Sequence, residues 1–156
     1  MNADIIPPTV SDASNTIDVT RRGIRSGPAP STIKRRASKI LTCLHCTGCE
    51  LSVVLCNDRF IRQLNREFRK KDTATDVLSF PLNEGRLNSP TDTLLGDIVI
   101  SVETAQRQAK ELGGTLLTEV TSLLVHGVLH LLGYTHDNAP NEAEMNSMAI
   151  QILQLF

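Results

Sequence analysis

The feature that most constrains this chain is a long apolar stretch with the period of an α-helix near its C-terminal end. It runs from about Leu116 to Leu132 and stops at Gly133, a residue that readily takes the left-handed conformation in which helices end. A membrane span needs about 20 consecutive apolar residues, and the unbroken apolar runs here are much shorter. We therefore expect a soluble globular protein with this helix buried in it.

Length and composition favour one domain with an aliphatic core. The 156 residues fit a single domain, and a domain of this size buries about 70% of its unfolded surface. Aromatic residues make up only 3% of the chain, which argues against RNA-binding sheets that stack bases on rows of aromatic side chains. The N-terminus lacks a charged start followed by an apolar run, so we expect no secretory signal and predict a cytoplasmic protein.

Short β-branched runs and amphipathic helical patterns follow one another in a mixed order. Strands are predicted at 50–56, 76–80 and 95–101, and Pro81 favours an edge position for the second of them. This order predicts a single α+β domain in which helices pack on a small sheet. Helical patterns begin near Ser31, Asn57, Ser101, Leu116 and Pro140.

The first thirty residues have a different character. Residues 1–30 contain four prolines among Ser, Thr and Gly, with no sustained period. We expect an extended N-terminal arm there, with at most one short strand at 16–20. The predicted folded domain therefore comprises residues 31–156.

The net charge of −1 hides a strong asymmetry along the chain. Residues 19–71 hold 13 of the 16 Lys and Arg against three acidic residues, and so carry a charge of +10. Residues 72–156 carry −8, and residues 1–18 carry −3. A basic half of this size is a candidate surface for a polyanion, with scattered and solvated charge as the alternative.

Three of the four histidines fall within eleven residues. Because four residues make slightly more than one helical turn, His126 and His130 are expected on the same helical face. Gly133 then turns the chain back, so that His136 can approach the same point. Three imidazoles without a fourth protein ligand describe an open catalytic site for one zinc ion, whose bound water has a pKa of about 7. The alternative is that these histidines pack in a core helix or face solvent.

The stretch 126–136, HGVLHLLGYTH, resembles the signature of the YbeY family of endoribonucleases, which mature ribosomal RNA. Segments 64–81 and 95–101 are similar to the other two sequence blocks of that family and occur in the expected order. The resemblance implies a zincin-like fold with a mostly parallel sheet, an antiparallel edge strand and a metal on the penultimate helix. It also implies cleavage of single-stranded RNA in maturation and quality control of the small ribosomal subunit, with ribosomal RNA and assembly factors as partners.

The resemblance also assigns individual residues. Arg69 corresponds to the functionally important arginine of the family, and a planar guanidinium suits the charge that develops on a phosphodiester under attack. Lys70 and Lys71 follow it directly and are candidates for binding the RNA backbone. In the alternative interpretation, the three bases only stabilise a helix C-terminus through its dipole. The metal-binding positions of the family correspond to His126, His130 and His136.

Two other functions are compatible with the sequence. The spacing of the histidines and Gly133 equals the H-E-x-x-H-x-x-G-x-x-H pattern of metzincin metalloproteases. Those enzymes use the glutamate after the first histidine as their general base, and Gly127 stands at that position here. The other alternative is a non-catalytic ribosome-assembly factor with a structural metal, which would use the same basic surface.

The cysteines form a separate pattern. Cys43, Cys46 and Cys49 are spaced C-x-x-C-x-x-C, with His45 inside the pattern and Cys56 seven residues further on. Such spacing can hold zinc or an iron–sulfur cluster. The family resemblance implies no ligand there, and disulfides are not expected without an export signal. We expect reduced thiols, with a second metal site as the alternative.

Overall fold

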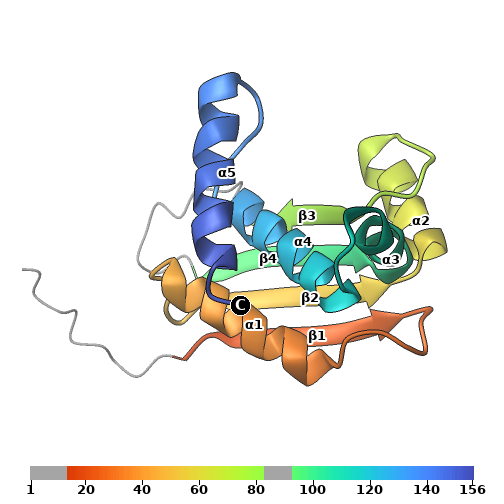
Figure 1. Ribbon diagram of the computed structural model, residues 1–156, viewed down its shortest axis with the longest axis horizontal. Helices are drawn as coiled ribbons and strands as arrows, with labels where there is room; N and C mark the ends of the chain where they lie inside the picture. The colour runs from red at the N-terminus through yellow and green to blue at the C-terminus, as the bar shows by residue number, and fades with distance from the viewer. Residues whose placement is uncertain (1–13, 83–92) are drawn as a thin grey trace, which may run out of the picture.

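The computed structural model describes residues 14–82 and 93–156. Within them, five helices pack on a four-stranded sheet (Figure 1). This architecture confirms the predicted α+β class. The elements in chain order are β1 (Thr16–Arg22), α1 (Pro30–Cys43), β2 (Glu50–Cys56), α2 (Asp58–Arg69), β3 (Val77–Pro81), β4 (Leu94–Ser101), α3 (Val102–Leu112), α4 (Leu116–Leu131) and α5 (Ala139–Leu153).

The sheet is mostly parallel, with an antiparallel strand at one edge. Its strand order is β1-β2-β4-β3, in which β1 and β4 both pair with β2 in parallel. Strand β3 pairs with β4 in antiparallel orientation and ends at Pro81. A proline cannot donate to a further strand, so the edge position predicted for this segment is confirmed.

Strand β1 corrects the predicted boundary between arm and domain. It is seven residues long and pairs with β2 along its whole length, from Thr16 opposite Glu50 to Arg22 opposite Cys56. Ile17 is buried in the main core. The segment escaped detection as part of the domain because an edge strand with one buried residue has little apolar pattern of its own. The rest of the predicted arm, residues 1–13, lies outside the described residues.

Each face of the sheet is covered differently, because alternate strand residues point to opposite faces. On one face, Leu51, Val53 and Ile98 belong to a large buried cluster with side chains of α1, α3, α4 and α5. On the other face, Cys56 and Val99 belong to a smaller cluster that α2 covers. Figure 1 shows α1 and α4 side by side on the first of these faces.

The helix boundaries follow local capping signals. The side chain of Asn57 accepts a hydrogen bond from the backbone N–H of Phe60 and begins α2. Ser101 does the same for the N–H of Thr104 and begins α3, which ends at Gly113 with a φ of 70°. These caps confirm the predicted starts of both helices.

Among the described residues, no single helix is long and apolar enough to cross a membrane. Helices α3 and α4 meet the criteria of length and composition only when taken together, and the pair is bent by 113° at the break between them.

Candidate functional site

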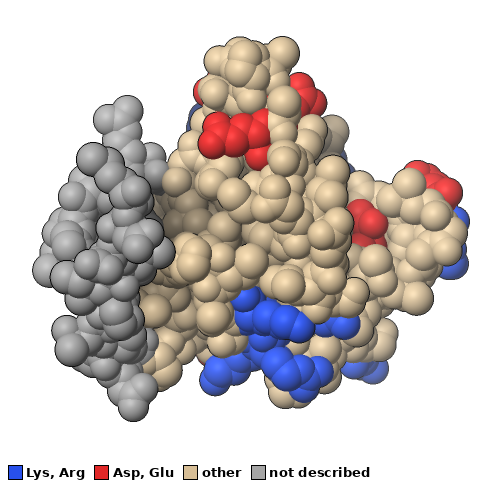
Figure 2. Space-filling model, turned by 60° about the vertical axis from the view of Figure 1, so that its left-hand side comes forward, with Lys and Arg blue, Asp and Glu red and all other residues tan. Residues whose placement is uncertain are grey.

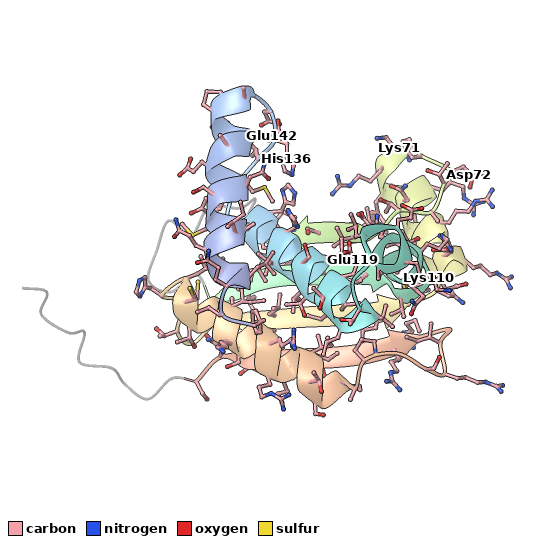
Figure 3. The ribbon with its side chains drawn as sticks, in the orientation of Figure 1. Lys71, Asp72, Lys110, Glu119, His136 and Glu142 are labelled. Atoms are coloured by element: carbon pink, nitrogen blue, oxygen red, sulfur yellow. The ribbon has the colours of Figure 1, made fainter. Side chains whose placement is uncertain are left out.

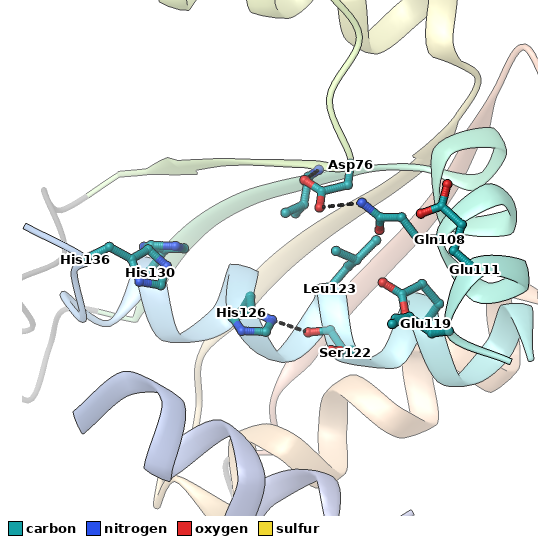
Figure 4. Close-up of a pocket in the computed structure, with 11 residues that line it drawn as sticks. Asp76, Gln108, Glu111, Glu119, Ser122, Leu123, His126, His130 and His136 are labelled. Carbon is teal, nitrogen blue, oxygen red and sulfur yellow. Dashed lines mark hydrogen bonds between the residues drawn. The ribbon is translucent and has the colours of Figure 1, made fainter. Parts of the chain in front are cut away.

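Helix α4 carries two of the three candidate metal ligands on one face. His126 and His130 lie one turn apart, and after the end of α4 Gly133 takes a φ of 97° that turns the chain back. The centroid of the His136 ring thereby lies 5.0 Å from that of His130. All three histidines line one pocket with a volume of about 580 Å³ (Figure 4).

Backbone carbonyls hold two of the histidine rings in a defined tautomer. Nδ1 of His126 lies 2.9 Å from the carbonyl oxygen of Ser122, and Nδ1 of His130 lies 3.1 Å from that of Tyr134. Because a carbonyl oxygen only accepts, Nδ1 of each ring carries the donated proton. In the neutral ring, Nε2 therefore has the free lone pair that a metal ion requires.

Burial favours the uncharged form of the central histidine. Desolvation lowers the pKa of His130 below its ordinary value, because it penalises the imidazolium form. The hydrogen bond to Tyr134 acts in the opposite direction. Coulombic interactions with His136, His126 and Arg69 lower the pKa of His130 further. At neutral pH His130 is therefore in the form that binds metal.

Imidazole nitrogens are suitable donors for a metal ion, but in the structure the three histidine rings do not converge on one point. Within residues 14–82 and 93–156, no group of three or more His, Cys, Asp or Glu side chains could hold a metal ion as placed. His126 is separate from the neighbouring rings of His130 and His136 (Figure 4). The assignment of these histidines as ligands therefore stays a prediction, supported by their donor chemistry and their shared pocket.

Arg69, the candidate catalytic residue, is the last residue of α2. Its Nη2 atom donates a hydrogen bond to the backbone carbonyl of Ser79 in β3 over 3.1 Å. Oγ of Ser79 donates in turn to the carbonyl of Gly127 over 3.4 Å, and Gly127 is the neighbour of His126 in α4. The charge of Arg69 also contributes to the lowered pKa of His130. The structure thus brings Arg69 close to the histidine pocket.

The two lysines after Arg69 have different surroundings. Lys70 is the C-cap residue of α2 with a φ of 58°, and its Nζ donates to the carbonyl of Glu67 over 3.3 Å. This contact at the C-terminus of α2 agrees with the alternative interpretation, in which the basic residues stabilise the end of the helix. Lys71 is exposed beyond the end of α2 (Figure 3). Neither is among the described residues that line the histidine pocket, so their role in RNA binding stays a prediction.

The pocket also has an acidic wall. Asp76, Glu111 and Glu119 line its other end (Figure 4). Burial and the charge of Asp76 raise the pKa of Glu119, and His126 acts in the opposite direction. Glu119 had a detectable signal, since it lies seven residues before His126 and thus on the same helical face. Asp76 and Glu111 come from other elements and join it only through tertiary packing.

Gly127 stands where metzincin proteases carry their catalytic glutamate, and it faces the sheet. A Cβ atom at this position would lie 2.8 Å from Cγ2 and 3.0 Å from Cδ1 of Ile98 in β4. Gly127 itself is buried. A side chain at this position would therefore enter the core and not the pocket, so the site lacks the general base of that protease class.

The cysteine segment does not bring three candidate metal ligands together as placed in the described part of the chain. All four cysteines are free, with Cys46, Cys49 and Cys56 buried and Cys43 exposed. Burial raises the pKa of Cys46 to about 11 and that of Cys56 to about 12. These thiols are therefore protonated at neutral pH, whereas a metal site needs thiolates. The reduced thiols and the alternative second metal site both stay predictions.

The fold and the pocket define a class of protein, an α+β domain with a histidine-lined pocket along its penultimate helix. A comparison with protein families identifies which member of that class it resembles. The family model described as Endoribonuclease YbeY matches residues 23–156. This chain belongs to that family, as the three sequence blocks predicted.

Individual relatives agree with this assignment. Endoribonuclease YbeY of Myxococcus xanthus is 49% identical over 117 residues, which cover 75% of this chain and 40% of that protein. Endoribonuclease YbeY of Aquifex aeolicus is 48% identical over 110 residues, which cover 70% of this chain and 71% of that protein. The solution structure of a Thermotoga maritima protein matches with a TM-score of 0.63 and 26% identity, over 89% of this chain and 87% of that one.

Proposed function

We propose that this chain is a metal-dependent endoribonuclease that cleaves single-stranded RNA. In this proposal it acts in the cytoplasm, on ribosomal RNA during maturation and quality control of the small ribosomal subunit, together with assembly factors. Membership of the family and the names of its relatives support this activity. The observation that carries the proposal is the position of the Arg69 guanidinium, which belongs to α2, donates to the carbonyl of Ser79 in β3 and is near enough to lower the pKa of His130 in α4.

One zinc ion bound by His126, His130 and His136 is part of the proposal. Three imidazole nitrogens are typical of a zinc site that keeps a position open for water. When bound, the ion acts as a Lewis acid and lowers the pKa of a water molecule to about 7. The carbonyls of Ser122 and Tyr134 would orient two of the rings by holding their Nδ1 protons, which leaves the Nε2 lone pairs for a metal ion.

Arg69 supplies the positive charge that cleavage of a phosphodiester needs. The non-bridging oxygens gain negative charge as the phosphorus is attacked, and a guanidinium donates two parallel hydrogen bonds to such a group. The bond to Ser79 restricts the guanidinium before RNA binds, so less reorganisation is needed during the reaction. In the same proposal Lys70 and Lys71 attract neighbouring phosphates, because both side chains are exposed.

A test with two substrates separates this function from the two alternatives. The protein is incubated with single-stranded RNA and with casein, each with and without a chelator. The proposal requires that RNA is cleaved only without the chelator and that casein stays intact. Cleavage of casein would identify a metalloprotease, which the buried position of Gly127 disfavours. RNA that is bound but never cut would identify an assembly factor with a structural metal.

A further inference from the structure

The exposed side of α1 carries a group of positive charges that the histidine pocket does not use. No Asp or Glu occurs between residues 19 and 49. Figure 2 shows Lys and Arg side chains gathered on this side of the molecule, away from the acidic residues at the far end of α5. We call this surface the α1 basic face and define it by four residues of α1, Lys34, Arg35, Arg36 and Lys39.

The charge of this face is not neutralised within the described residues. In the described part of the chain, the ion pairs between side chains are Arg62 with Asp72 and Arg107 with Asp58, and neither pair involves a residue of α1. Lys39 instead donates to a backbone carbonyl over 2.8 Å. Arg36 and Lys39 both lie over the ring of Phe156, at 4.9 and 5.2 Å from its centroid. This aromatic contact orients the two cations but leaves their charge in place.

The same charges are unfavourable for the helix that carries them. Lys34, Arg35 and Arg36 are three consecutive cations in the second turn of α1. The first turn contains no acidic residue, and Ala29 at the N-cap offers no side-chain hydrogen bond. Arg35 and Lys39 are also four residues apart, a spacing at which like charges repel. Like charges that are not paired with an acidic side chain within the described residues indicate that the face meets an external anion.

Helix α4 separates the α1 basic face from the pocket. Nη1 of Arg36 donates to Oγ1 of Thr121 in α4 over 2.8 Å. The next residue, Ser122, lines the pocket and accepts from the ring of His126. The two surfaces are thus on different sides of one helix, about 10 Å across. A strand in the pocket must therefore extend beyond it to reach α1.

We propose that the α1 basic face binds the phosphate backbone of RNA outside the segment that the pocket holds. The proposal rests on the proposed function for the identity of the polyanion. Phosphate contacts position a nucleic acid without reading its sequence, and exposed Lys and Arg are the residues that make them. The face therefore anchors long RNA and contributes nothing to base preference.

The test compares two double variants with the same net charge. Lys34→Gln with Arg35→Gln removes two exposed charges from α1, and Arg59→Gln with Arg66→Gln removes two from α2, on the opposite face of the sheet. Binding of fluorescent poly(U) is measured by anisotropy, in EDTA, over a series of salt concentrations. Thermal unfolding checks that each variant is folded, and the α1 pair is expected to unfold at or above the wild-type temperature because repulsion is relieved.

The α1 pair is expected to reduce the log–log salt dependence of binding by about 1.4, since each lost phosphate contact contributes about 0.7 for single strands. The α2 pair is expected to stay close to the wild type. Equal losses in both pairs would overturn the proposal, because RNA would then respond to net charge and not to location. The proposal would also be overturned if the α1 double variant bound poly(U) like the wild type. The same holds if, in a parallel measurement with vesicles of anionic lipid, the α1 double variant lost binding to the vesicles but not to poly(U). Absence of RNA cleavage by the wild-type protein would refute the proposed function alone, because the anisotropy measurement needs no catalysis.

Discussion

Arg69 at the end of α2 donates a hydrogen bond from Nη2 to the backbone carbonyl of Ser79 in β3, over 3.1 Å. The acceptor is a main-chain group of the sheet, so the position of the guanidinium depends on the fold and not on a flexible partner. Oγ of Ser79 donates to the carbonyl of Gly127 over 3.4 Å, which connects the same strand to α4. Two hydrogen bonds therefore relate the arginine to the helix that carries His126 and His130.

The first prediction concerns Arg69. If Arg69 stabilises negative charge on the phosphate, Arg69→Ala reduces single-turnover RNA cleavage by about 10²–10³, the usual effect of losing one preorganised donor. Arg69→Lys restores the rate only in part, because an ammonium does not reproduce a two-pronged contact. Metal content stays at the wild-type level. The matched control is Arg66→Ala, an exposed arginine one turn earlier that lies outside the pocket. Wild-type rates in both Arg69 variants would assign this residue to the surface.

The second prediction concerns the metal. His130→Ala is expected to abolish stoichiometric metal binding and RNA cleavage, because it removes the central one of the three imidazoles. Elemental analysis of the purified protein measures the metal, and far-UV circular dichroism checks the fold. His45→Ala serves as the control, since this exposed histidine lies in the cysteine segment. Loss of metal in His45→Ala but not in His130→Ala would place the metal among the cysteines.

The third prediction concerns the packing of α4 on the sheet. Gly→Ala inside a helix normally stabilises a protein by up to about 1 kcal/mol. Gly127→Ala is instead expected to destabilise it by about 1–3 kcal/mol, because the new methyl group overlaps the buried side chain of Ile98. Urea unfolding measures the difference. Gly114→Ala is the control, since a Cβ atom there meets nothing within 4 Å. A stable Gly127→Ala variant would show that Ile98 can move aside.

The fourth prediction concerns Asp58, whose carboxylate joins α2 to α3. It accepts hydrogen bonds from Ser101 and Thr104, each over 2.6 Å, and pairs with Arg107 over 2.8 Å. Burial alone would raise the pKa of Asp58, but these partners outweigh it and hold the pKa below the ordinary value of 3.8. Asp58→Asn is therefore expected to lower the free energy of unfolding by about 1–2 kcal/mol at neutral pH.

The pH dependence of this effect has a definite sign. Because the folded-state pKa is depressed, the contribution of Asp58 is complete above pH 3.8 and is lost as the pH falls through the folded-state value. Urea unfolding at pH 7 and near pH 3 is expected to show a smaller difference between wild type and Asp58→Asn at the lower pH. Asp72→Asn, which breaks an exposed pair with Arg62, is expected to have a smaller effect at neutral pH. Equal losses in the two variants would contradict the assigned role of Asp58.

Local sequence patterns predicted most of the elements correctly. Strand β2 was predicted with its observed bounds, and Asn57 and Ser101 begin their helices as capping residues do. Such signals lie within a few residues of the feature they control, so one sequence contains them in full. Strand β1 was underestimated for the opposite reason. Its pairing depends on β2, which is more than thirty residues away, and its own residues are mostly polar or half-buried.

The features of the candidate site also separate into those that local sequence determines and those that depend on tertiary packing. The sequence by itself determined that His126 and His130 share a helical face and that Gly133 turns the chain, because helical period and glycine conformation are local properties. Only the tertiary structure decided that Arg69 donates to Ser79 in β3 and that Asp76 and Glu111 complete the pocket wall. It also decided that Gly127 faces Ile98 and leaves no room for a protease base. The physical reason is that these relationships depend on how separate elements pack around one core, and no local pattern in the chain records that packing.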